Sequence, residues 1–285
     1  MIRFNLFDIT RRRLFVLLST ASFFAFLIWF LNSVLPYKNV WDSFYTEKDI
    51  GTFFCEKTVM QNMVRQPINT FSNFIYWIAA VAILNRGWRD LGKTTRYNII
   101  SANPFYSLTL GVIMLFIFSA SVFFHSSLIH AASELDFSAV YSLSLFPLMY
   151  FVHRVWLLRI GVPSNQRHPR STRILIVIFS SAYLLLTFFL PSHGRLRDYV
   201  VLGIIIILIL LGFIVERYDR GKTNHYYLLA AISSILFAVM WFIFDIHKVF
   251  CNPDSYIQPH SLWHLFSGIA AFYFYMYIRS EHNKI

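Results

Sequence analysis

Eight long apolar runs constrain the fold of this chain more than any other feature. They lie at residues 14–35, 67–85, 104–128, 136–158, 172–190, 198–216, 225–246 and 260–279. Each is close to the roughly 20 apolar residues that a helix needs to cross a hydrocarbon core about 30 Å thick. Only 14% of the residues are charged, against about 25% in a typical soluble domain. The sequence therefore predicts an all-α, polytopic membrane helix bundle.

The basic residues lie mostly in the short segments between these runs. If the chain begins on the inner side of the membrane, 18 of its 25 Lys and Arg residues fall in inner segments. The positive-inside rule then places both termini in the cytoplasm. The net charge of +11 is explained by this topology, so we expect no nucleic-acid partner. Nothing in the sequence indicates an obligate protein partner.

Three histidines and an aspartate stand at run ends that share the outer side of the membrane. His125 is near the end of the third run, and His260 and His264 open the last. A spacing of four residues puts two imidazoles on one helix face, which suits bonds of about 2.0–2.1 Å to a single zinc ion. Asp136 opens the fourth run on the same side. The pattern predicts a buried metal site near the outer, periplasmic or lumenal, face.

Further polar residues belong to this pattern, and each has an ordinary structural interpretation as well. Ser121 precedes His125 by one helical turn, but a serine there also bonds readily to the carbonyl of residue 117. Asp136 could be a helix N-cap, and His125 an interfacial histidine. Asp245 is either an orienting partner of a metal-bound imidazole or a solvated helix end. Ionisable groups at membrane depth are costly and usually functional, so their convergence favours the metal site.

The two cysteines, Cys55 and Cys251, both fall on the outer side in this topology. An even pair in an oxidising compartment permits a disulfide, and two unrelated thiols are the alternative. A disulfide would tie the segment 37–66 to the loop that precedes His260.

Taken together, these motifs resemble the alkaline ceramidases, which belong to a superfamily of seven-helix membrane hydrolases that includes the adiponectin-type receptors. The likeness rests on S-x-x-x-H with an aspartate eleven residues later, followed by H-x-x-x-H. It extends to C-E at 55–56, N-T-x-S-N at 69–73 and W-x-x-x-D-x-x-x-x-x-C at 241–251. It implies a seven-helix hydrolase domain at 37–285. A basic lead and an extra N-terminal transmembrane helix would occupy 1–36.

The resemblance also implies roles for individual residues. The three motif histidines would hold Zn²⁺, Asp136 would contact the catalytic water, and Ser121 would help to hold the oxyanion. The two cysteines would form a disulfide.

The sequence departs from the family pattern at the positions of the calcium site. Eukaryotic ceramidases bind Ca²⁺ through an acidic cluster around the C-E motif. This chain keeps Glu56, which is at most the remnant of such a site. The other calcium-site positions hold Phe53, Phe54, Thr58 and Gln66. These substitutions argue against calcium binding.

The predicted function is zinc-dependent hydrolysis of the N-acyl bond of ceramide-like membrane lipids, which gives a fatty acid and a sphingoid base. One alternative is another lipid acyl hydrolase of the same superfamily, acting on a phospholipid or remodelling a glycolipid anchor. The other is a non-catalytic receptor that holds structural zinc.

Overall fold

The structure is a computed structural model that describes residues 53–91, 98–161, 169–190, 196–219 and 223–281, with Thr20, Trp41 and Phe44 as isolated positions. Within these ranges all regular secondary structure is helical, so the predicted all-α bundle is confirmed. The run at 14–35, and with it the extra helix expected in 1–36, lies outside the described residues.

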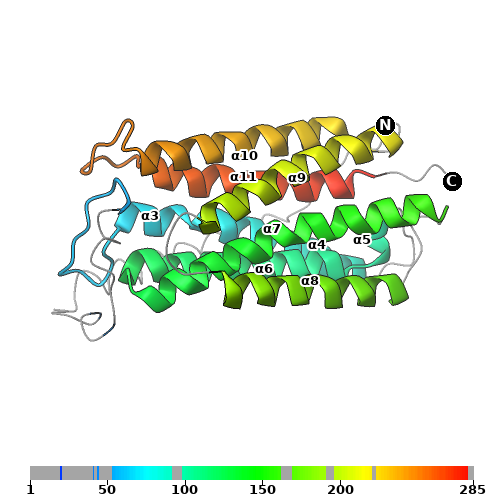
Figure 1. The fold of residues 1–285 in the computed structure, drawn as a ribbon, viewed down its shortest axis with the longest axis horizontal. Helices are drawn as coiled ribbons and strands as arrows, with labels where there is room; N and C mark the ends of the chain where they lie inside the picture. The colour runs from blue at the N-terminus through cyan, green and yellow to red at the C-terminus, as the bar shows by residue number, and fades with distance from the viewer. Residues whose placement is uncertain are drawn as a thin grey trace.

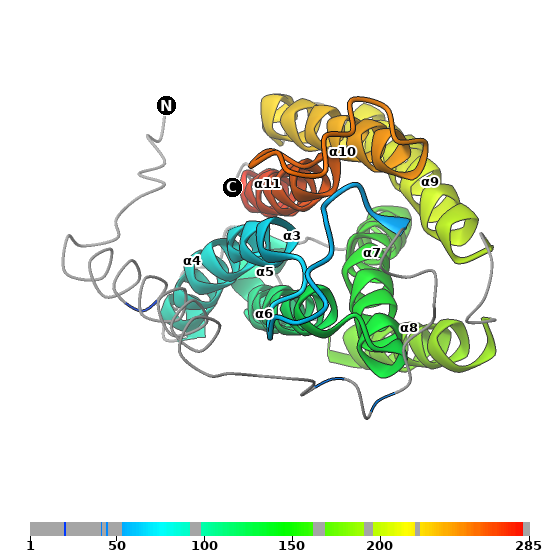
Figure 2. The same cartoon turned by 90° about the vertical axis from the view of Figure 1, so that its left-hand side faces the viewer.

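The long helices run side by side along one axis, with α3 at one end of the bundle (Figure 1). In chain order the helices of the described ranges are α3 (Pro67–Ser72), α4 (Phe74–Leu91), α5 (Ile99–Ala102), α6 (Phe105–Ser127), α7 (His130–Arg159), α8 (Pro169–Phe189), α9 (Leu196–Asp219), α10 (His225–Ile246) and α11 (Pro259–Arg279). Seen from the α3 end, α10 and α11 lie together on one side, and α4, α6 and α7 lie on the other (Figure 2).

The start of α7 corrects one prediction. The helix begins at His130, six residues before the expected start, so Asp136 lies well inside it and is not its N-cap. Only Leu128 and Ile129 separate α6 from α7, and Leu128 adopts a left-handed conformation with φ 51°. Such a φ is uncommon outside glycine. It reverses the chain sharply and returns α7 along α6.

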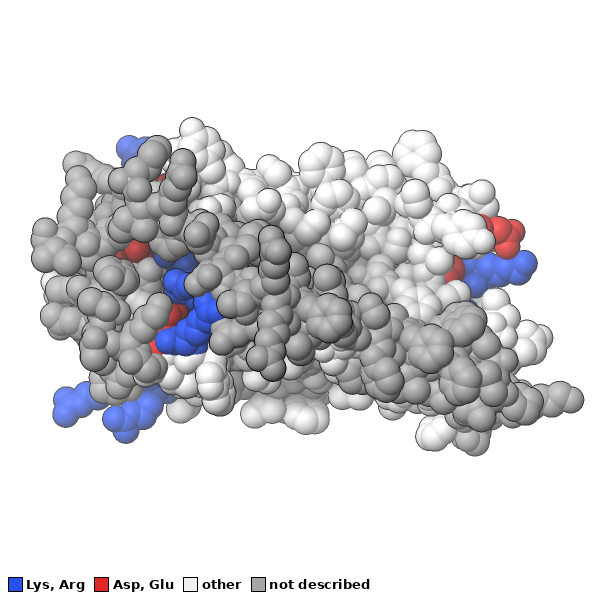
Figure 3. Space-filling view, turned by 180° about the vertical axis from the view of Figure 1, so that it is seen from behind, with Lys and Arg blue, Asp and Glu red and all other residues white. Residues whose placement is uncertain are grey.

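Six of the described helical segments are long and apolar enough to cross a membrane. Large apolar side chains on α8 and α9 point outward, and Phe188 and Phe189 are 74% and 78% exposed. Such surfaces are stable when lipid covers them. In Figure 3 the visible charged residues gather toward the two ends of the long axis, and the described surface between them is uncharged. The protein is a multi-pass membrane bundle.

A glycine on α11 allows this helix to approach α4 closely. A Cβ atom on Gly268 would lie 2.7 Å from Ile75 Cγ2, closer than packed side chains allow. The contact holds the two helices in register just beyond His264. One core of buried side chains from α4, α6, α7 and α11 continues from there along the bundle. Its largest members include Tyr76, Ile83, Leu110, Met114, Tyr150 and Phe274.

Buried ion pairs join the helices at the end of the bundle opposite α3. Arg279 of α11 donates to Asp90 of α4 at 2.6 Å. Arg154 of α7 contacts Glu281 at 2.6 Å, and both side chains are almost fully buried. We call these four residues the arginine end, and we call the region around His125, His260 and His264 the histidine end.

Candidate metal centre

The three predicted histidines meet in space and are buried. His125 comes from α6, and His260 and His264 come from the first two turns of α11. Their exposed fractions are 0%, 5% and 3%. One ring nitrogen from each lies within 4.8 Å of the other two. Two of the rings therefore share one face of α11, as the i, i+4 spacing predicted. The third ring comes from α6.

Hydrogen bonds to two Nδ1 atoms fix the orientation of the rings. Gln66 Oε1 lies 2.9 Å from His125 Nδ1, and an amide oxygen can only accept, so this Nδ1 carries the proton. Ser72 Oγ lies 2.7 Å from His264 Nδ1 and donates its own proton to the Asn69 carbonyl. It therefore accepts from His264 Nδ1. In both rings Nε2 is left without a proton, as a metal ligand must be.

Asp245 supports the third ring from α10. Its Oδ2 lies 3.4 Å from His260 Nδ1, which is an ion-pair contact and is longer than a hydrogen bond. Its Oδ1 accepts a hydrogen bond of 2.8 Å from the backbone N–H of Cys55. Asp245 is buried, so the alternative of a solvated helix end is wrong.

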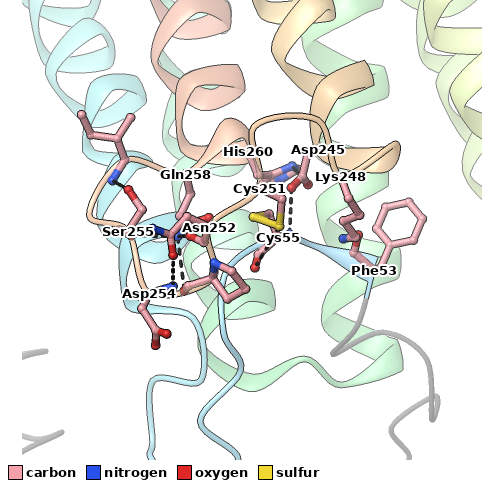
Figure 4. Close-up of a disulfide and its surroundings, with 12 residues drawn as sticks. Phe53, Cys55, Asp245, Lys248, Cys251, Asn252, Asp254, Ser255, Gln258 and His260 are labelled. Atoms are coloured by element: carbon pink, nitrogen blue, oxygen red, sulfur yellow. Dashed lines mark hydrogen bonds and ion pairs between the residues drawn. A yellow bond between two sulfur atoms is a disulfide. The ribbon is translucent and has the colours of Figure 1, made fainter.

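The predicted disulfide between Cys55 and Cys251 is present, with the Cα atoms 5.5 Å apart. Figure 4 shows it beside Asp245 and His260. It joins the segment before α3 to the loop between α10 and α11. The cysteines therefore hold Asp245 and its backbone donor together at the edge of the centre.

Ser121 and Asp136 share one level of the bundle because of the tight turn between their helices. Ser121 stands six residues before the end of α6, and Asp136 stands six residues after the start of α7. Their side chains interact across the two helices, although Ser121 Oγ is buried and makes no hydrogen bond of standard geometry within the described chain. The alternative of a hydrogen bond from this hydroxyl to the carbonyl of residue 117 is therefore wrong.

Glu56 has a structural role that the sequence did not indicate. Its two oxygens accept the backbone N–H groups of Ile68 and Asn69, at 2.7 and 2.8 Å, and so cap the start of α3. Burial raises the pKa of Glu56 to about 7, against the lowering effect of these two hydrogen bonds. The carboxylate holds α3, and through it Ser72, in place beside His264. The expectation that Glu56 is at most the remnant of a calcium site stays a prediction.

These residues fit a zinc ion chemically. His125 Nε2 is buried and has no hydrogen-bond partner in the described chain, which is costly unless a ligand satisfies it. Three neutral imidazoles are a donor set that zinc favours, and they leave a further coordination position for water or substrate. Phe54 covers the rings of His125 and His260, with centroids 4.9 and 4.3 Å away. The centre is therefore enclosed on that side by an aromatic ring.

The ceramidase family model matches residues 51–283 of the sequence. The chain belongs to the ceramidase family. No curated protein matches it. As a ceramidase, the chain is a hydrolase that acts on an amide bond, and its histidine cluster could hold a metal.

The sequence pattern grouped the three histidines correctly but did not indicate the residues that support them. Gln66 and Ser72 had no assigned role, because a residue that bonds the far nitrogen of an imidazole has no fixed spacing from it. Ser72 did stand in the N-T-x-S-N motif that carries the family likeness, and this was the available signal. Gln66 drew attention only as an altered position of the family's calcium site, and not as a partner of His125.

An apolar cavity begins beside this ceramidase centre. Its first lining residues on α6, α7 and α11 stand one turn beyond Ser121, Asp136 and His264. They are Ile117, Val140 and Ser267. Tyr76 lies at the same level and shares a 2.6 Å hydrogen bond with Ser267. The polar centre therefore faces an apolar space within the membrane-spanning helices.

Proposed function

We propose that the protein is a zinc-dependent amidase that hydrolyses the N-acyl bond of ceramide in the membrane. The observation that carries this proposal is the position of the three buried imidazoles at the head of an apolar cavity. A lipid amide needs that combination, because its scissile bond is polar and its chains are not. Membership of the ceramidase family supports the choice of an amide substrate.

Zinc held by His125, His260 and His264 would supply Lewis-acid chemistry, activating a water molecule and polarising the amide carbonyl. Asp136 accepts the proton of the attacking water and passes it to the leaving amine, which is the part of a general acid–base. Its place on α7, opposite Ser121, supports this role.

Ser121 donates its hydroxyl proton to the oxygen that becomes negative as the amide carbon is attacked. A fixed donor in a dry site stabilises such charge far better than one in water. Burial of Ser121 and the absence of a standard hydrogen bond to its Oγ within the described chain support this assignment.

The partner is a membrane lipid that enters with one hydrocarbon chain in the cavity. The orientation proposed from the Lys and Arg distribution puts both termini in the cytoplasm and the histidine end toward the periplasm or an organelle lumen. The Cys55–Cys251 disulfide supports this side, because such bonds persist in oxidising compartments.

The test is a lipid panel combined with metal analysis on the purified protein. Wild type is expected to contain about one zinc per chain and to release fatty acid from ceramide. His260→Ala is expected to lose both zinc and activity, and His130→Ala to keep both, because His130 lies outside the cluster. Cleavage of phospholipid without cleavage of ceramide would favour the acyl-hydrolase alternative. Zinc without turnover of any lipid would favour a structural-zinc receptor and contradict the proposal.

A further inference from the structure

The apolar cavity extends along the bundle from the level of the histidine end. It follows α7, α9, α10 and α11 away from the histidine end and is lined almost entirely by aliphatic and aromatic side chains. The last lining residues on α7, α10 and α11 are Phe151, Leu228 and Phe274. The rings of Phe151 and Phe274 pack edge to face, with centroids 5.6 Å apart. We call these three residues the cavity floor.

The distance from the centre to the floor follows from helix geometry. Asp136 and Phe151 are both on α7, fifteen residues apart. A rise of 1.5 Å per residue makes this distance about 22 Å. The cavity is thus deep and lies parallel to the helices, which suits one extended hydrocarbon chain.

Polar groups lie directly behind the floor. Phe151 and Phe274 both contact the ring of Tyr277, whose hydroxyl donates to Glu216 at 3.0 Å. Thr223 donates to the same carboxylate oxygen at 2.7 Å. A chain that passed the floor would press methylene groups against this hydrogen-bonded carboxylate. Inserted methylenes would break these hydrogen bonds, and burying a polar group without its partners is costly. We therefore expect a bound hydrocarbon chain to end at the floor.

We propose that Phe151, Phe274 and Leu228 set the length of the substrate chain that this enzyme cleaves best. The inference rests on the proposed function, because it assumes that a lipid amide reacts at Asp136 and His125. Chains that reach the floor bury all their methylenes. Longer chains must displace the two rings, and shorter chains leave apolar space unfilled. One methylene more or less in such a pocket changes kcat/KM by about tenfold or more.

Two opposite substitutions test the length limit. Phe274→Ala removes one ring of the floor and deepens the cavity. Ala270→Leu adds bulk at a lining position one turn nearer the centre, about 6 Å closer along α11. We expect Phe274→Ala to shift the preferred chain to longer lipids and Ala270→Leu to shift it to shorter ones. Each shift should change the ratio of kcat/KM between long and short substrates by about tenfold.

The substrates form two series, one that varies the N-acyl chain and one that varies the sphingoid base. The shift should occur in one series only, and that series identifies the chain in the cavity. Phe272→Ala is the matched control, because Phe272 is on the same helix and does not line the cavity. It should keep the wild-type length preference. If Phe274→Ala fails to fold, Ala270→Leu still decides the question.

Unchanged length preferences in an active Ala270→Leu or Phe274→Ala enzyme would overturn the length limit and leave the amidase proposal intact. Wild-type protein that cleaves no lipid amide of any length would instead overturn the amidase proposal. Equal shifts in both series would also contradict the inference, because the cavity would then not be selecting a single chain.

Discussion

The two ends of the bundle both bury polar side chains, but they use them differently. At the arginine end, Arg279 faces Asp90 and Arg154 faces Glu281, so each charge meets an opposite charge from a distant part of the chain. At the histidine end, three imidazoles converge, and His125 Nε2 and Ser121 Oγ lack standard hydrogen-bond partners among the described residues. The charges of the first arrangement are paired within the protein, and the second brings together three ring nitrogens that could share one metal ion.

We therefore expect the arginine end to contribute mainly to stability and the histidine end mainly to chemistry, although both are built on the same helices. α11 takes part in both ends, with His260 and His264 in its first turns and Arg279 at its last residue. A buried pair is strongly destabilising when broken, and an unsatisfied buried atom is costly unless a ligand binds it. Substitutions at the arginine end should therefore change folding, and substitutions at the histidine end should change metal and turnover.

Asp136→Asn gives the largest expected effect. The change keeps the size of the side chain but removes its ability to accept a proton, so ceramide turnover should fall by about 10²–10⁴-fold. Zinc content should stay near wild type, because Asp136 is not in the ligand cluster. Kinetics and metal analysis on the same preparation check both points. An active Asp136→Asn enzyme would refute the proton-transfer role.

Arg279→Ala should act on the other end and on stability. It breaks the buried ion pair between Arg279 and Asp90, and breaking such a pair costs about 3–5 kcal/mol. Thermal unfolding in detergent should show a large drop in midpoint, while the folded fraction keeps its zinc. Lys57→Ala is the matched control, because the Lys57–Asp254 pair is exposed and exposed pairs contribute about 0–1 kcal/mol. Similar losses in the two variants would contradict the comparison.

The sequence predicted the membrane-length helices and the histidine pair of α11 because both depend on local spacing. Apolar runs of membrane length specified α4 and the helices from α6 to α11, and H-x-x-x-H placed two histidines on one face of α11. The start of α7 was missed, because the left-handed turn at Leu128 occurs at a non-glycine residue that carries no turn signal. Gln66 and the Arg279–Asp90 pair depend on tertiary contacts between residues far apart in sequence. No periodicity reports such contacts.

Gln66→Ala should weaken zinc binding by a smaller factor than loss of a ligand. It removes the acceptor that fixes the His125 ring, and such outer partners of metal ligands are worth about 10–100-fold in affinity. Competition with a chelator measures this directly, independently of turnover. Gln61→Ala is the matched control, because Gln61 is exposed on the same segment. Equal zinc affinity in Gln66→Ala and wild type would show that the ring is held by packing alone.

The smallest expected effect is the contribution of Glu56 to the pH dependence of stability. Unlike the acids of the arginine end, Glu56 has no ion-pair partner among the described residues and is held by two backbone N–H groups. Its pKa is raised by burial from 4.5 to about 7. The folded protein therefore binds more protons than the unfolded chain between these values, and the free energy of unfolding should fall as the pH rises through this window. The slope is at most about 1.4 kcal/mol per pH unit for one group.

Glu56→Gln should flatten this slope, since a neutral amide does not titrate. Unfolding midpoints of both proteins at pH 5 and pH 7 measure the difference. The same pH dependence in the two proteins would mean that Glu56 stays ionised in the fold, with its N–H donors outweighing its burial.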